Sequence, residues 1–125
     1  MDRTILVVDD ETVTTQLAET FLGRHGFKVE CAYDGEEALE IAEATEPDLI
    51  LLDVMLPKMI GYEVCSILKS KEKFKETPIL FFTAKGLKRD IARGKEAGGD
   101  DYIIKPFSGK ELVELIREHL GIEET

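Results

Sequence analysis

The stretch Asp48-Leu49-Ile50-Leu51-Leu52-Asp53 contains four consecutive aliphatic residues between two carboxylates. An apolar run without polar alternation is typical of a central parallel strand that helices cover on both faces. Three further apolar runs also stop at residues that can do chemistry: Ile5-Leu6-Val7-Val8 before Asp9 and Asp10, Ile79-Leu80-Phe81-Phe82 before Thr83, and Tyr102-Ile103-Ile104 before Lys105. In an open α/β sheet, ligands bind at the edge where the carboxyl ends of the strands meet. Three carboxylates, a hydroxyl and an ammonium are therefore expected at one edge, which favours binding of a divalent cation and a phosphoryl group.

Helical patterns alternate with short apolar runs along the whole 125-residue chain. This alternation predicts repeated βα units with right-handed connections, and therefore a doubly wound α/β fold with five parallel strands and five helices in one domain over residues 1–125. The expected strands are Thr4–Asp9, Lys28–Ala32, Asp48–Asp53, a run opened by Pro78, and Asp101–Lys105. The expected helices are Val13–Arg24, Asp34 to about Thr45, Tyr62–Ser70, Leu87–Ala97, and Ser108 to Gly121. The fourth helix has the weakest pattern because Gly94 interrupts it.

Two of these helices carry start signals. Asp34 and Glu37 have the spacing of a capping box, and Ser108 and Glu111 have the same spacing. In such a box the first residue offers a side-chain oxygen to an N–H group of the first turn that has no partner inside the helix. Gly121 is typical of the residue that ends a helix. These signals predict where the second and fifth helices begin and where the fifth ends.

The chain carries 26 acidic and 16 basic residues, which gives a formal net charge of -10. Such a charge repels the phosphates of nucleic acids and of anionic lipids, so we expect no direct nucleic acid partner and no membrane. No apolar run approaches the ~20 residues of a membrane span, and the run after Thr4 is too short for a signal peptide. Cys31 and Cys65 match no metal or redox spacing and are interpreted as reduced thiols, which favours a cytoplasmic location.

The two adjacent acids Asp9 and Asp10 have two interpretations. An aspartate at a strand end often caps the next helix. Acids that face a third carboxylate repel one another unless a cation intervenes, and Mg²⁺ accepts one or two carboxylates in proteins. Taken alone, the pair favours neither interpretation. Asp53 is either a turn residue or a nucleophile that can form an aspartyl phosphate, and Thr83 and Lys105 can offer a hydroxyl and an ammonium to phosphate oxygens.

The same residues fall in four blocks that resemble one known family. The blocks are Leu6–Glu11, Asp53–Pro57 with Gly61, Thr83-Ala84, and Gly98–Phe107. Their order and spacing resemble those of the receiver domain of two-component response regulators, over essentially the whole chain. The resemblance implies a flavodoxin-like sheet with strand order 2-1-3-4-5. Ile60, where many members carry Asp, and Gly99, where Ala is frequent, depart from the common pattern without touching the acidic residues.

The resemblance also implies a role for the residues of the sheet edge. Asp53 resembles the phosphoacceptor, which is the site of phosphorylation. Asp9 and Asp10 resemble the acids that bind Mg²⁺, with Asp53 and the backbone carbonyl of Met55 as further ligands. Lys105 resembles the phosphate-binding lysine.

Two positions resemble the residues that transmit the signal. Thr83 matches the switch hydroxyl, which acts on the phosphoryl group together with the lysine, and Tyr102 matches the aromatic switch residue. The Lys105–Pro106 bond matches a peptide bond that is usually cis in the family. Lys85 matches a position that flanks the phosphoryl group, where it either screens the phosphoryl group or is solvated.

The function that the resemblance implies is two-component signal transduction. A phosphohistidine on a sensor histidine kinase, or on a histidine phosphotransfer protein, would donate its phosphoryl group to Asp53 with Mg²⁺ as the cofactor. The face formed by the fourth helix, the fifth strand and the fifth helix would then change, and a downstream effector protein would recognise it. The chain would be a monomer or a phosphorylation-dependent dimer, with no enzymatic activity beyond slow autodephosphorylation.

Five alternatives remain at this level. A phosphorelay shuttle, or a receiver excised from a longer regulator, fits the same residues. An Mg²⁺-dependent aspartyl-phosphate hydrolase is less favoured, because it usually needs a second acid where Met55 stands. A flavin carrier needs a phosphate-cradling loop after the first strand, and the acids Asp9 and Asp10 would repel that phosphate. A degenerate receiver that only binds partners is disfavoured by the complete set of acids, threonine and lysine.

Overall fold

The computed structural model describes residues 3–83 and 88–122, and for Thr83 and residues 88–91 it describes the backbone alone. Within these residues the strands are β1 (Thr4–Val8), β2 (Lys28–Ala32), β3 (Leu49–Asp53), β4 (Ile79–Thr83) and β5 (Asp101–Ile104). Neighbouring strands pair in parallel, and the order across the sheet is β2-β1-β3-β4-β5. The expected doubly wound, flavodoxin-like sheet with order 2-1-3-4-5 is confirmed.

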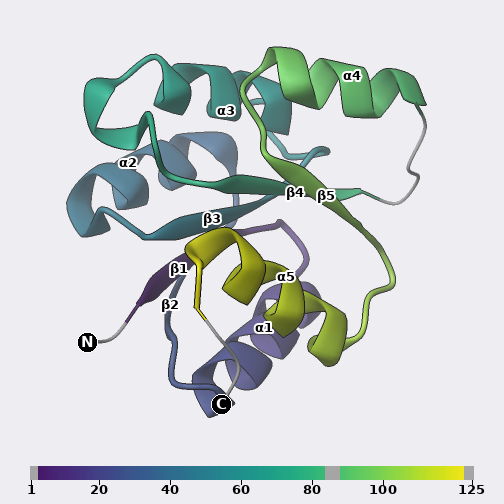
Figure 1. Ribbon diagram of the computed structural model, residues 1–125. Coiled ribbons are helices and arrows are strands. Elements are labelled where there is room, and N and C mark those ends of the chain that lie inside the picture. Colours follow the sequence, from purple (N-terminus) through teal and green to yellow (C-terminus); the bar gives the residue numbers. More distant parts are fainter. Residues whose placement is uncertain (1–2, 84–87, 123–125) are drawn as a thin grey trace.

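The described residues form five α-helices, which cover the sheet in two layers (Figure 1). Their bounds are α1 (Thr12–Arg24), α2 (Gly35–Thr45), α3 (Gly61–Lys69), α4 (Lys88–Glu96) and α5 (Gly109–Leu120). α1 and α5 pack on one face of the sheet, and α2, α3 and α4 pack on the other. A short 3-10 helix, η1 (Glu72–Phe74), follows α3 and is not predicted by the sequence pattern. None of the helices in this described part of the chain has the length and hydrophobicity that crossing a bilayer requires.

The central strand β3 is buried along its whole length. Its successive side chains point to opposite faces, so that Ile50 and Leu52 enter the apolar cluster under α2 and α3, whereas Leu49 and Leu51 enter the cluster under α1 and α5. Fully burying a side chain of this kind contributes roughly 1.5–3 kcal/mol to stability. The aliphatic run thus packs against both helix layers and places Asp53 at the buried end of β3.

The predicted helix caps are present. The Asp34 side chain accepts a hydrogen bond from the Glu37 backbone N–H at 2.8 Å, and the Ser108 hydroxyl accepts one from the Glu111 N–H at 3.0 Å. The Glu37 carboxylate bonds to the backbone N–H of Tyr33 at 2.9 Å, one residue before the cap. These contacts fix where the loops that follow β2 and β5 end and where α2 and α5 begin.

The observed ends of several elements differ from the predicted ones by one residue. β1 and β5 stop at Val8 and Ile104, so Asp9 and Lys105 lie just beyond the strands, where their side chains can turn across the sheet edge. Asp48 precedes β3, and its carboxylate accepts a hydrogen bond from the Thr4 backbone N–H at 2.8 Å. Gly94 lies inside α4 without ending it. The fourth predicted helix begins at Leu87, which is outside the described residues.

Candidate functional site

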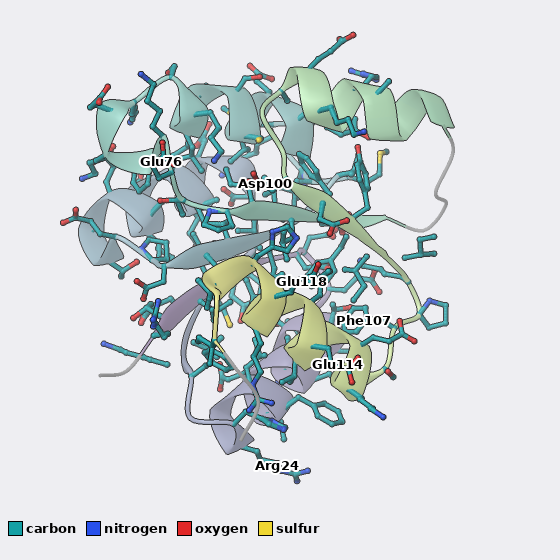
Figure 2. The ribbon with its side chains drawn as sticks, viewed as in Figure 1. Arg24, Glu76, Asp100, Phe107, Glu114 and Glu118 are labelled. Carbon is teal, nitrogen blue, oxygen red and sulfur yellow. The ribbon has the colours of Figure 1, made fainter. Side chains whose placement is uncertain are left out.

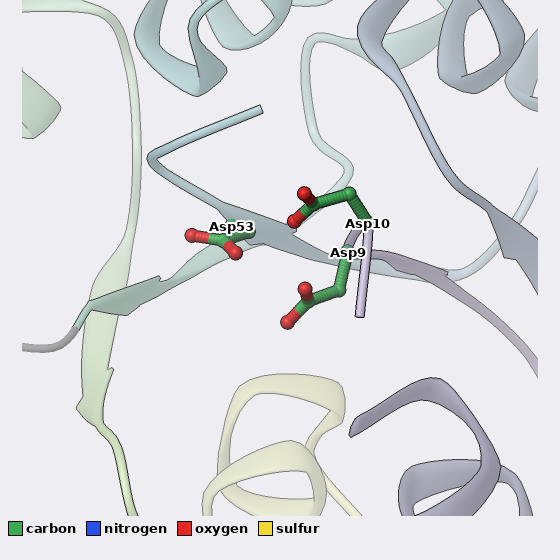
Figure 3. Close-up of side chains that lie close together, drawn as sticks. All are labelled: Asp9, Asp10 and Asp53. Carbon is green, nitrogen blue, oxygen red and sulfur yellow. The ribbon is translucent and has the colours of Figure 1, made fainter. Parts of the chain in front are cut away.

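Three carboxylates meet at the carboxyl ends of the adjacent strands β1 and β3 (Figure 3). Val8 and Leu52 are paired in the sheet, so Asp9 and Asp53, one residue further along, lie beside each other. One oxygen from each of Asp9, Asp10 and Asp53 lies within 4.8 Å of the others. Asp9 and Asp53 are buried, whereas Asp10 is exposed. A cluster of carboxylate oxygens with one side open to solvent fits the ligand preference of a hard divalent cation such as Mg²⁺.

The ammonium of Lys105 lies between two of these acids. Its Nζ atom is 2.7 Å from Asp9 Oδ2 and 3.1 Å from Asp53 Oδ2, and it is 3.7 Å from the Glu11 carboxylate. Burial acts to lower the pKa of Lys105, but the hydrogen bonds and charges of Asp9 and Asp53 outweigh burial, and the pKa is raised. Lys105 therefore remains an ammonium at the centre of the site.

Asp53 has a pKa raised from its ordinary value of 3.8 to about 6. Burial is the largest cause and the charge of Asp9 adds to it, while the Met55 N–H bond and the charge of Lys105 act in the opposite direction. The pKa stays raised because burial disfavours the charged form of Asp53 and the negative charge of Asp9 adds to this effect. A divalent cation bound beside Asp53 would favour its charged form.

Both oxygens of the Asp9 carboxylate have partners within the protein, and Asp9 does not cap α1, whose N-cap is Glu11 without a side-chain cap bond. The Asp9 Oδ1 atom accepts a hydrogen bond from the Glu11 backbone N–H at 2.9 Å, which orders the start of α1, while Oδ2 faces Lys105. Among the residues that the structure describes, no side chain forms a hydrogen bond or an ion pair with the Asp10 carboxylate. Asp9 is thus held in place by the protein, and Asp10 is left to solvent or to a ligand.

The backbone after Asp53 is held in close contact with the first turn of α3. The Met55 N–H donates to Asp53 Oδ1 at 3.0 Å, and the Met55 side chain is exposed. The Gly61 N–H donates to the Val54 carbonyl at 2.8 Å. A Cβ atom at Gly61 would collide with the Asp53 carbonyl oxygen, so this approach requires glycine. The loop that carries Asp53 and Met55 is therefore fixed at both ends.

On the other side of the site, aromatic residues support Lys105. The rings of Phe82 and Phe107 stack at 5.1 Å between centroids, and the Lys105 ammonium lies 5.7 Å from the Phe82 ring. The Lys105–Pro106 peptide bond is cis, as the resemblance implies. Phe107 lies in the connection between β5 and α5 (Figure 2). This connection and α1 line a groove of about 300 Å³ next to Lys105, with Val13 and Leu17 exposed on its wall.

The two predicted switch residues are described to different extents. Thr83 is the last residue of β4, but its side chain lies outside the described part of the chain, as does all of Lys85. Tyr102 on β5 is half-buried, packs on Phe81, and hydrogen-bonds to the Tyr62 hydroxyl. The sequence analysis gave no role to Tyr62. The one feature that could have indicated a role is its position, directly after Gly61 at the start of α3.

Comparison with known proteins identifies the family. The model of the response regulator receiver domain matches residues 5–117. The chemotaxis response regulator CheY4 of Vibrio cholerae is 31% identical, with 95% of this chain and 99% of that one covered and a TM-score of 0.92. A response regulator from Chloroflexus aurantiacus is 36% identical, with coverage of 97% and 99% and a TM-score of 0.92. The chain belongs to the response regulator receiver domain family of two-component systems.

One similar structure contains a metal ion. It is the receiver domain of a sensor histidine kinase from Pseudomonas aeruginosa, with a magnesium ion coordinated in its active site cleft. It is 32% identical to this chain, with coverage of 97% and 99% and a TM-score of 0.89. Receiver domains are phosphoacceptors that interact with histidine kinases and effectors, and this chain shares their fold.

Proposed function

We propose that this chain accepts a phosphoryl group on Asp53 from the phosphohistidine of a sensor histidine kinase or a histidine phosphotransfer protein. The observation that carries the proposal is a buried carboxylate, Asp53, in contact with an ammonium, Lys105, and beside two further acids. Family membership supports the same role.

In the proposed reaction, a carboxylate oxygen of Asp53 attacks phosphorus. A new O–P bond forms while the P–N bond to the donor imidazole breaks, and the electron pair of that bond stays on the imidazole nitrogen. With a pKa of about 6, Asp53 is mostly ionised at neutral pH and is able to attack. The Met55 N–H holds Oδ1 in place, and Lys105 lies where it can bind a phosphoryl oxygen. The chain thus contributes positioning and charge stabilisation, which dominate phosphoryl transfer.

Mg²⁺ would be held by Asp9, Asp10, Asp53 and the backbone carbonyl of Met55. When bound, it supplies positive charge that offsets the repulsion between the carboxylates and the incoming phosphoryl oxygens. The cluster fits this ion because its donors are carboxylate oxygens. The carboxylate of Asp10 is also open to solvent, so an ion can reach it. With Mg²⁺ present, three carboxylates and one ammonium form a neutral site.

Phosphorylation then changes the charge of the site, because a dianionic group replaces the single charge of Asp53. Thr83 moves toward the new oxygens and Tyr102 fills the space that Thr83 leaves. The face formed by α4, β5 and α5 changes as a consequence, and an effector protein recognises it. The same chemistry fits a phosphorelay shuttle or one receiver within a longer regulator. A phosphatase-type hydrolase has less support, because the position that would carry its second acid is the exposed apolar side chain of Met55.

The direct test is labelling with radioactive acetyl phosphate in the presence of Mg²⁺. We expect one phosphoryl group per chain in the wild type and none in Asp53→Asn. Asp48→Asn, which makes the same change at the opposite end of β3, is the matched control and retains the label. Stoichiometric, acid-stable labelling of Asp53→Asn would refute the assignment. Turnover of many equivalents of acetyl phosphate per minute would instead indicate a hydrolase.

A further inference from the structure

Tyr62, the second residue of α3, belongs to a cluster of three aromatic rings that joins α3, β4 and β5. Its side chain is buried, and its ring meets the ring of Phe81 edge-on at 5.1 Å and 68°. Phe81 in turn packs on Tyr102 at 5.4 Å. The Tyr102 hydroxyl donates a hydrogen bond to the Tyr62 hydroxyl at 3.3 Å. Tyr102 on β5 is thus held on its inner side by a residue of α3.

α4 lies directly over this cluster. A Cβ atom at Gly94 would collide with the phenol of Tyr102, so the phenol occupies the place of a side chain on α4. The Arg93 guanidinium lies 4.9 Å from the centre of the Tyr62 ring, which is a favourable cation–π distance. Both tyrosines therefore contact α4, and the position of that helix depends on where the Tyr102 ring lies.

Tyr62 also follows immediately after the loop that carries Asp53. The Gly61 N–H is bonded to the Val54 carbonyl, and the Gly61 Cα approaches the Asp53 carbonyl so closely that no side chain fits. A displacement of this loop therefore moves the first turn of α3, including Tyr62. This path from Asp53 to α4 does not pass through Thr83.

We propose that Tyr62 is a positioning residue of the switch, whose hydroxyl holds Tyr102 inward against Gly94 and so couples the loop after Asp53 to α4. This inference rests on the proposed function, since it takes Tyr102 as the residue that reports phosphorylation. Removing the Tyr62 hydroxyl lowers the fraction of molecules in which the Tyr102 ring lies inward. A phosphoryl mimic that favours the inward position then binds more weakly, because ligand affinity and conformational population are linked.

The first measurement follows Tyr102 directly. The chain has three tyrosines, so protein labelled with 3-fluorotyrosine gives three fluorine resonances. In Tyr62→Phe one resonance disappears, and we expect the Tyr102 resonance to move toward the shift of an exposed tyrosine. Tyr33→Phe, a change at an exposed position, is the control and leaves Tyr102 unchanged. A Tyr102 resonance that stays in place in Tyr62→Phe overturns the proposal.

The second measurement is the affinity for beryllofluoride with Mg²⁺ in a double-mutant cycle. We expect Tyr62→Phe to weaken binding about three- to tenfold, the effect of one hydrogen bond. In the Tyr102→Phe background, we expect the same change to have a clearly smaller effect, because the hydrogen bond between the two hydroxyls is already absent. An equal loss in both backgrounds means that Tyr62 acts only as a structural residue, and the proposal fails.

The two levels of proposal fail in different ways. A wild type that binds no beryllofluoride contradicts the proposed function. The fluorine resonances still test whether Tyr62 positions Tyr102 in that case. A wild type that binds beryllofluoride and a Tyr62→Phe variant of equal affinity contradict this inference alone. Gly94→Ala provides an independent probe, because alanine favours the helix while its methyl group displaces the Tyr102 phenol. We expect Gly94→Ala also to move the Tyr102 resonance and to weaken beryllofluoride binding.

Discussion

Asp53 makes the stability of the metal-free protein depend on pH. Its pKa is about 6 in the folded chain against an ordinary value of 3.8, mainly because of burial, with a contribution from the Asp9 charge. The folded state therefore keeps a proton that the unfolded state loses. The stabilisation that this proton provides is complete below about pH 4 and is lost as the pH rises through 6. Above that pH the buried charge is a cost, which Asp53→Asn removes.

We therefore expect Asp53→Asn to be more stable than the wild type at pH 8, by up to about 3 kcal/mol. The two free energies of unfolding converge toward pH 4. Urea unfolding in a chelator at pH 4, 6 and 8 measures the difference, and saturating Mg²⁺ at pH 8 should reduce it. A difference that is constant across this range contradicts the assigned direction of the shift.

Lys105 is the residue whose replacement separates phosphate binding from metal binding. Its ammonium contacts the Asp9 and Asp53 carboxylates, and Lys105→Met removes the charge while keeping most of the side-chain volume. We expect labelling by acetyl phosphate to slow roughly ten- to a hundredfold, since a hydrogen bond to a charged group contributes about 1.5–3 kcal/mol. Mg²⁺ affinity should persist or increase, because one positive charge has left the cluster. Lys110→Met, an exposed change on α5, is the control and should label at the wild-type rate.

Among the elements, α1 presents an apolar surface beside the site. Val13 and Leu17 are 67% and 47% exposed, and they line the groove that reaches Lys105. A protein phosphodonor must approach the site from solvent, and such a patch is a suitable contact surface. We expect Leu17→Glu to slow transfer from a phosphorylated histidine phosphotransfer domain that labels the wild type, by about tenfold, and to leave acetyl phosphate labelling unchanged. Ala44→Glu adds the same charge at an exposed position on α2 and should have no effect. Equal slowing with both donors would show damage to the site itself.

The strands and most helices could be predicted from the sequence because their signals are local. Uninterrupted apolar runs mark the buried strands, and Asp34 and Ser108 mark the starts of two helices. The 3-10 helix η1 was missed because three residues give no periodicity. Gly94 weakened the prediction of α4, and the reason for a glycine there lies in a residue of another element, Tyr102 on β5, whose phenol fills the space next to it.

At the scale of the whole molecule, the sequence predicts where the three acids meet, but it does not predict the side-chain contacts between remote elements. Parallel strand ends meet at one edge, so the topology alone places Asp9, Asp10 and Asp53 together. Contacts between side chains of remote elements follow no pattern along the chain. The Tyr62–Tyr102 hydrogen bond joins residues 40 apart, and the His119–Asp101 contact at 2.9 Å joins the end of α5 to β5. These contacts depend on the final packing angles of the helices, which apolar periodicity does not specify.

The net charge of -10 and the acidic cluster both act on the stability of the whole fold, and salt can separate them. Like charges destabilise the compact state, so NaCl should raise the melting temperature by screening. Mg²⁺ should raise it further at equal ionic strength, because a ligand that binds only the folded state stabilises it by about 2.7 kcal/mol at a hundred times its dissociation constant.

The rise in melting temperature that is specific to Mg²⁺ can be used to test whether the ion binds at the cluster of Asp9, Asp10 and Asp53. We expect this rise to be lost in a variant that carries both Asp9→Asn and Asp10→Asn, whereas Glu40→Gln, a change at an exposed position on α2, retains it. The reason is that Asp9 and Asp10 offer two of the three clustered carboxylates, while Glu40 contributes only to the overall charge. Calorimetric melting in Mg²⁺ and in NaCl of matched ionic strength measures the difference. If the Mg²⁺-specific gain survived the double change, the ion would bind elsewhere, and the charge balance proposed for phosphoryl transfer at Asp53 would lose its basis.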